Sequence, residues 1–175
     1  MTKQRYLVQH DYGMGALWWW IHARSPREIL ETFAEVEVMQ TAEAIERAEG
    51  WGGLDEVDID ILPMPPGLDG LRERRDGQRD RPGFGALADR EIVYLRHDGE
   101  EGDASVYLTE VGSDGRRIRQ VELTGDGAAI RYDEDSWFFN PPLVDLYDPD
   151  LPQREIERAE FERAWANARP AEPEE

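Results

Sequence analysis

The chain has 175 residues and a formal net charge of −19, with 39 acidic residues against 20 lysines and arginines. A field of this sign repels nucleic acid and anionic membranes, so we expect neither as a partner, although solubility alone would also explain the charge. The absence of cysteine excludes disulfides and thiol nucleophiles and favours a cytoplasmic protein. All but one of the basic residues are arginine, which is typical of a GC-rich bacterium.

The segment 16–23 contains three consecutive tryptophans and is the most informative part of the chain. We predict that residues 5–10 and 16–23 are strands of a hairpin, joined by the glycine-containing connector 11–15. If His10 pairs with Ala16, Val8 faces Trp18, and both faces of the hairpin are apolar. Such a hairpin is either enclosed between two packed layers or has one side left for a partner.

Two helices are predicted after the hairpin. Ser25 can cap a helix whose first position is Pro26, and Glu28 completes a capping box. The apolar stripe of this helix is expected to cover one face of the hairpin. A second, shorter helix is predicted to begin at Thr41 and to end at the glycines of residues 50–53.

Residues 63–89 are rich in proline and glycine and are predicted to form a long irregular loop. Arginines within this loop could bind phosphate or RNA with Phe84 as a stacking group. Acidic residues alternate with these arginines, however, so a loop held by salt bridges is the favoured interpretation. The arginines concerned are Arg72, Arg74, Arg75, Arg79 and Arg81.

Four strand-like runs follow, at residues 90–97, 104–111, 116–124 and 128–133, and the glycine-rich segments between them predict an antiparallel meander. A C-terminal helix is predicted over residues 157–167, and a disordered acidic tail over 169–175. We therefore expect the α+β class, with residues 1–168 forming a single domain. Its predominantly antiparallel sheet would combine the N-terminal hairpin with the meander and pack against two or three helices.

No metal or cofactor is expected from the sequence. His10 and His22 lie at opposite ends of the predicted hairpin and cannot share one ion. Glu56, Asp58 and Asp60 would lie on one side of a strand and could hold Mg²⁺ or Ca²⁺, but the solvated face of a half-buried strand explains the same alternation.

The function predicted from these features is that of a non-catalytic, acidic protein-binding module, such as an immunity-type inhibitor of a basic protein. Trp18 and Trp20 would form its aromatic anchor, surrounded by Glu56, Asp58 and Asp60. Exposure of so large an apolar area would be unfavourable, however, so burial of this face in the core beneath the helix that carries Phe161 and Trp165 is favoured over a standing interface.

Two other classes of function remain open. A small enzyme or ligand-binding protein would have its pocket at the hairpin turn, where His10, Asp11 and Tyr12 could act with Arg81. Because adjacent residues of a strand point to opposite faces, a turn-forming role for Asp11 is favoured over a His10–Asp11 dyad. The third class is a structural subunit of a larger assembly, and the sequence predicts no oligomeric state.

Overall fold

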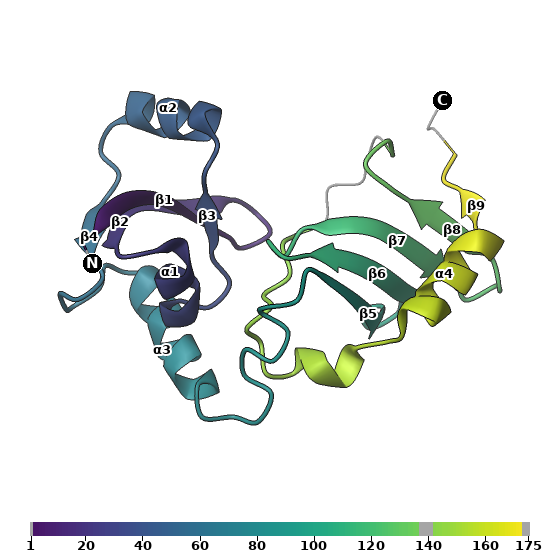
Figure 1. The fold of residues 1–175 in the computed structure, drawn as a ribbon. Coiled ribbons are helices and arrows are strands. Elements are labelled where there is room, and N and C mark those ends of the chain that lie inside the picture. Colours follow the sequence, from purple (N-terminus) through teal and green to yellow (C-terminus); the bar gives the residue numbers. More distant parts are fainter. Residues whose placement is uncertain (1, 137–141, 173–175) are drawn as a thin grey trace. The chain divides into compact units, whose positions relative to one another are not determined.

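The computed structural model describes residues 2–136 and 142–172. It confirms the α+β class, and the chain divides into two compact units, residues 1–84 and 85–175 (Figure 1). The hairpin and the meander were expected to share one sheet, but they lie in two separate sheets. Short strands occupy both edges of the hairpin, which leaves no free edge for the meander to join. That the chain folds as a single domain stays a prediction.

The sheet of the first unit has the strand order β3-β1-β2-β4. Strands β1, β2 and β3 are antiparallel, whereas β4 runs parallel to β2. Their bounds are β1 Gln4–Asp11, β2 Ala16–Ala23, β3 Glu37–Met39 and β4 Glu56–Asp58.

The register of the hairpin differs by one residue from the predicted one. Asp11 pairs with Ala16, so Val8 lies opposite Trp19 and not Trp18. Asp11 continues the strand, and the connector closes as a shorter turn in which Tyr12 N donates to Gly15 O at 3.0 Å. Because side chains alternate along a strand, this slip changes which apolar residues of the two strands share a face.

Both faces of the hairpin are covered within the first unit (Figure 1). Helices α1 (Pro26–Thr32) and α3 (Leu68–Gln78) contribute apolar side chains to the face that contains Val8, Trp19 and Ile21. Helix α2 (Ala42–Trp51) contributes Ala44, Ile45 and Ala48 to the opposite face, where they pack with Leu7, Trp18 and Trp20. The expectation that Phe161 and Trp165 cover this second face was wrong, because both belong to the core of the other unit.

The two predicted helix starts are confirmed. Ser25 Oγ accepts a hydrogen bond from Glu28 N at 3.1 Å, and Thr41 Oγ1 accepts one from Ala44 N at 3.3 Å. The Glu28 carboxylate reaches back to Arg24 N at 2.7 Å, one residue before the cap. These bonds satisfy amide groups that the first turn of a helix leaves without intrahelical partners.

The predicted irregular loop of residues 63–89 contains helix α3, so this expectation was wrong over residues 68–78. Leu68, Leu71 and Arg75 are its buried residues, and they follow the spacing of one helical stripe. An arginine within the stripe and two glycines within the helix concealed this pattern. The salt bridges expected for the arginines are present at Arg74, which pairs with Glu35 at 2.7 Å, and at Arg79, which pairs with Asp76 at 3.3 Å. Arg75 instead donates to the backbone carbonyl of Phe33 at 3.0 Å.

The sheet of the second unit has the strand order β5-β6-β7-β8-β9. The predicted meander of β5, β6, β7 and β8 is confirmed as antiparallel. Strand β9 pairs with β8 in parallel, so the predicted disordered tail is wrong at Arg169 and Pro170; residues 173–175 lie outside the described residues. The bounds are β5 Ile92–Asp98, β6 Val106–Gly112, β7 Arg117–Leu123, β8 Ala129–Tyr132 and β9 Arg169–Pro170.

Helix α4 (Arg158–Asn167) covers one face of this second sheet, where Phe161 is fully buried together with Leu108 and Val121 (Figure 1). On the opposite face, Leu146 and the 3-10 helix η1 (Leu151–Arg154) cover an apolar cluster around Val93. This cluster occupies one end of that face. The other end carries polar side chains from β5, β6 and β7.

Candidate functional site

The tryptophans predicted as a partner-binding anchor lie in the core of the first unit. Trp20 is only 7% exposed, and the guanidinium of Arg5 lies 4.1 Å from its ring centroid. Trp18 is half-buried and meets Trp51 edge to face, with ring centroids 5.2 Å apart. The burial interpretation therefore describes this face, with α2 as the covering helix.

The three carboxylates predicted to surround that anchor all have a hydrogen-bond or ion-pair partner within the first unit. Glu56 accepts a hydrogen bond from His22 Nε2 at 2.5 Å, Asp58 pairs with Lys3 at 2.5 Å, and Asp60 pairs with Arg24 at 2.7 Å. Hydrogen bonds from Arg24 and Lys3 lower the pKa of the Asp60 carboxyl to about 2. Within residues 2–136 and 142–172, no group of three potential ligands could hold a metal ion.

The alternative pocket at the hairpin turn does not form the predicted dyad. Asp11 Oδ1 accepts a hydrogen bond from Gly13 N at 2.8 Å, the turn-forming role that was favoured. His10 Nδ1 donates to Glu35 O at 2.8 Å, and Tyr12 is 56% exposed. Arg81 lies in the turns after α3, where its amide donates to Gln78 O.

Two hollows of the second unit share His97 and Asp98. The smaller has a volume of about 420 Å³ and lies between the end of β5 and the segment 153–156, which includes Arg154. The larger has a volume of about 720 Å³ and is lined by the turn between β5 and β6 together with Tyr107, Arg117 and Gln120. The polar end of the sheet is therefore hollowed on both sides of His97.

His97 lies against an aromatic neighbour and close to two arginines. Its ring stacks on Tyr107, with centroids 5.0 Å apart and planes 15° apart. The hydroxyl of Tyr107 donates to Asp103 Oδ2 at 2.8 Å, which holds this tyrosine in place. Burial, followed by the charges of Arg117 and Arg154, lowers the pKa of His97 to about 4. The imidazole is therefore neutral at pH 7 and can donate one ring N–H.

Arg117 reaches this face because of an irregularity in the pairing of β6 with β7. Glu110 pairs with Arg119, but the next residue, Val111, pairs with Arg117. Residues two apart on a regular strand share a face, and the register shift breaks this rule. Arg119 consequently lies beneath α4, whereas Arg117 lines the larger hollow with Tyr107.

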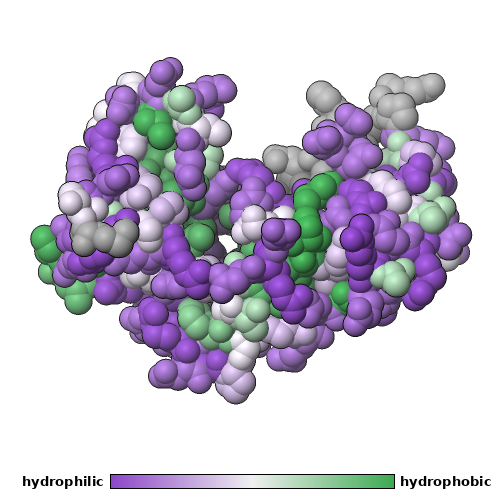
Figure 2. All heavy atoms as spheres, viewed as in Figure 1, coloured by the Kyte–Doolittle hydropathy of each residue, from purple (hydrophilic) through white to green (hydrophobic). Residues whose placement is uncertain are grey.

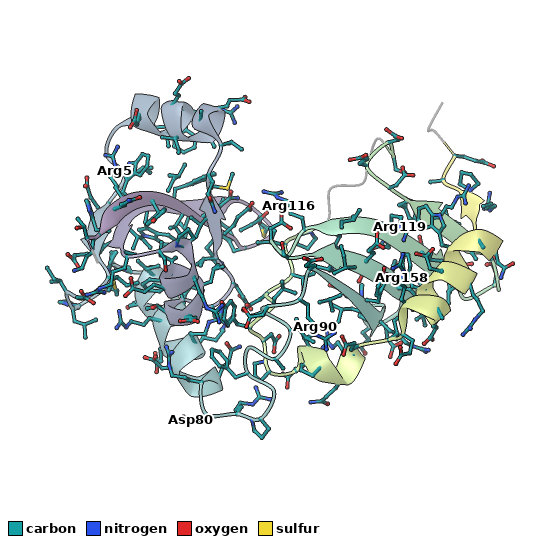
Figure 3. All side chains as sticks on the ribbon, viewed as in Figure 1. Arg5, Asp80, Arg90, Arg116, Arg119 and Arg158 are labelled. Atoms are coloured by element: carbon teal, nitrogen blue, oxygen red, sulfur yellow. The ribbon has the colours of Figure 1, made fainter. Side chains whose placement is uncertain are left out.

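The two arginines have opposite electrostatic environments. Arg119 pairs with Glu110 at 2.6 Å and with Glu162 at 2.8 Å, and these carboxylates raise the pKa of its guanidinium (Figure 3). Arg117 has no carboxylate partner among the described residues; its one hydrogen bond, to Gln120 Oε1, is long at 3.5 Å. Its Nε is buried without a partner, and burial lowers the pKa of its guanidinium.

The mouth of the larger hollow is formed by residues Asp98–Asp103, which we name the acidic turn. Asp98, Glu100 and Glu101 are exposed, and none of them has a cationic partner within the described part of the chain. Hydrogen bonds from Ser105 N and the Tyr107 hydroxyl lower the pKa of Asp103, which is therefore ionised as well. Hydrophilic side chains cover most of the surface seen in Figure 2.

The sequence predicted the acidic turn only as a hairpin connection. Arg117 and Arg154, which we name the arginine cluster, lie on β7 and η1 and have no common motif. An alternating pattern would have placed Arg117 on the same face as Arg119. The only local signal for this site was the concentration of four carboxylates in a six-residue turn.

Comparisons with family models, with curated proteins and with solved structures found no match. Among the described residues, no helix has the length and apolar character needed to cross a membrane.

Proposed function

We propose that the protein binds a basic partner protein without catalysing a reaction, and that the acidic turn is its principal contact surface. The observation that carries this proposal is that Asp98, Glu100 and Glu101 are exposed and have no cationic partner in residues 2–136 and 142–172. Asp58 and Asp60, by contrast, pair with Lys3 and Arg24 of their own unit, and Glu56 accepts a hydrogen bond from His22. A partner's lysines and arginines would provide the charges that the acidic turn lacks.

The charge of the second unit supports this location. Residues 85–175 contain ten arginines and 23 acidic residues, which gives a formal charge of −13, whereas residues 1–84 carry −6. Such a field accelerates association with a basic protein at low salt, and screening at physiological ionic strength limits its range to about 8 Å. Binding should therefore be fast and sensitive to salt.

The surroundings of His97 support a binding role over a catalytic one. A general base needs a partner that orients its ring towards the substrate. The described contact of the His97 ring is stacking on Tyr107, and no carboxylate in the described residues accepts a hydrogen bond from it. With its pKa lowered to about 4, this imidazole is also a weak base at pH 7.

The test compares two variants that remove equal charge. In the first, Asp98→Asn, Glu100→Gln and Glu101→Gln neutralise the acidic turn. In the control, Glu46→Gln, Glu73→Gln and Asp80→Asn neutralise three carboxylates of the first unit that also lack cationic partners among the described residues. Binding of a fluorescent peptide rich in lysine and arginine is measured by anisotropy at low and at physiological salt.

We expect the acidic-turn variant to bind the peptide about tenfold more weakly than the control at low salt, since each of the three lost charge contacts is worth a fraction of a kcal/mol to 1 kcal/mol. Added salt should reduce the difference between the two variants. Equal losses in both variants would show that only net charge matters and would overturn the assignment of the surface.

A further inference from the structure

The arginine cluster is unusual for a unit with so many carboxylates. Among the described residues, Arg90, Arg116, Arg119, Arg158 and Arg169 each pair with an acidic side chain. The other five arginines of the unit have no such partner within the described part of the chain, and two of them, Arg117 and Arg154 of the arginine cluster, line the larger and the smaller hollow. Arg117 therefore lines the same hollow as the carboxylates of the acidic turn without forming an ion pair with any described residue.

Within the arginine cluster, Arg117 has the greatest need of an anionic partner. Removing a guanidinium from water is costly unless hydrogen bonds and an opposite charge replace the water. The buried Nε of Arg117 has neither, and its bond to Gln120 is at the limit of hydrogen-bond length. The guanidinium stays charged at any physiological pH despite its burial. A ligand oxyanion entering the larger hollow would satisfy it, because a guanidinium can bind a carboxylate through two parallel hydrogen bonds.

The neighbours of Arg117 define what else the ligand must carry. His97 is neutral and can donate one N–H, and Arg154 is close enough to lower its pKa. The carboxylates of the acidic turn line the same hollow and would repel an anion with two negative charges. These neighbouring charges favour a ligand that has a single carboxylate at one end and a cationic group at the other.

We propose that the arginine cluster and His97 bind the carboxylate of a small zwitterionic ligand of the amino-acid class, whose cationic group contacts the acidic turn. This site does not depend on the proposed protein partner, since the ligand would bind to the protein alone. The chemistry is non-covalent on both sides, with the carboxylate at Arg117 and the cation at Asp98 or Asp103.

The experiment follows the ring protons of His97 by NMR while the protein is titrated with L-arginine. The chain has three histidines, so His97→Gln identifies the signal. L-Argininamide lacks the carboxylate, acetate lacks the cationic group, and inorganic phosphate supplies a dianion. We expect L-arginine to bind most tightly, to shift the His97 signals and to raise the pKa of His97 above about 4, because a bound carboxylate stabilises the imidazolium.

Two variants test the residues that we propose to bind the carboxylate of L-arginine, and a third variant is the control. Arg117→Gln should weaken L-arginine binding about tenfold or more, as expected for the loss of a charge-assisted hydrogen bond in a half-buried site. Arg154→Gln alters an exposed side chain and should weaken binding without affecting folding, so it applies even if Arg117→Gln is unstable. Arg163→Gln is the control, because Arg163 is exposed on α4 and lines neither hollow.

Equal affinity for L-arginine and L-argininamide would overturn the carboxylate assignment, and tighter binding of phosphate would overturn the zwitterionic class. Unchanged affinity in both Arg117→Gln and Arg154→Gln would overturn the location. These outcomes are separate from the peptide experiment, which depends on neutralising the acidic turn. Equal losses of peptide binding in the acidic-turn variant and its control would therefore overturn the protein-binding surface and leave the amino-acid site standing.

Discussion

The burial of Trp20 can be tested by its effect on stability. Trp20→Ala would remove a side chain that is 7% exposed and packs with Leu7 and Ala48, and it would also remove the ring that faces the guanidinium of Arg5. Replacing a buried large aromatic residue by alanine costs about 3–5 kcal/mol, and loss of an exposed cation–π contact adds about 0.5–1 kcal/mol. Such a loss approaches half of the stability of an ordinary domain, about 5–15 kcal/mol.

The assay is urea denaturation at pH 7, followed by far-UV circular dichroism, with the free energy of unfolding taken from the linear region. Trp51→Ala is the matched control, because Trp51 is 49% exposed at the end of α2 and contacts Trp18 through one edge. We expect this control to lose less than half as much stability as Trp20→Ala. A loss below about 1 kcal/mol for Trp20→Ala, within the range of surface substitutions, would refute the packing described for this face.

Two further predictions concern a helix cap and an ion pair. Ser25→Ala should reduce stability by about 1 kcal/mol through loss of the bond from Glu28 N, while Ser25→Asp should retain it; equal unfolding midpoints for all three proteins would contradict the cap. Arg119→Gln should cost about 3 kcal/mol at pH 7, because it leaves the Glu110 carboxylate buried without its arginine. Arg119 lowers the pKa of Glu110 from its ordinary value of 4.5, so the pair stabilises the fold above that pH and the contribution is lost as the pH falls further. Denaturation at several pH values should therefore show the wild type and Arg119→Gln converging in acid, and a constant difference would exclude this linkage.

Local patterns predicted much of the secondary structure correctly. Ser25 and Thr41 accept hydrogen bonds from amides three residues further along the chain, so the first turn contains all the information needed. The meander was predictable for a similar reason, because glycine-rich turns separate runs with strand propensity. Helix α3 was missed because Arg75 occupies a position of its buried stripe, where its guanidinium reaches the carbonyl of Phe33 on another segment.

The candidate site itself could not be predicted from the sequence. His97 and its two arginines come from β5, β7 and η1, and the site exists because the sheet and the segment 144–156 bring these elements together. The role of Arg117 depends on the register shift beside Val111, since without it this arginine would share the face of Arg119. The carboxylates of residues 56, 58 and 60 were predicted to form a partner-binding surface. In the fold they contact Lys3, Arg24 and His22 instead.

The sequence by itself determined the α+β class, the helix starts, the succession of strands and the strongly negative charge. These properties arise from composition or from interactions within a few residues of one another. Tertiary structure alone decided that the hairpin and the meander form separate sheets, that α2 covers the tryptophans, and which charged groups are left without partners. The physical reason is that strand register and ion pairing depend on packing between distant segments, whose free energy no local pattern encodes.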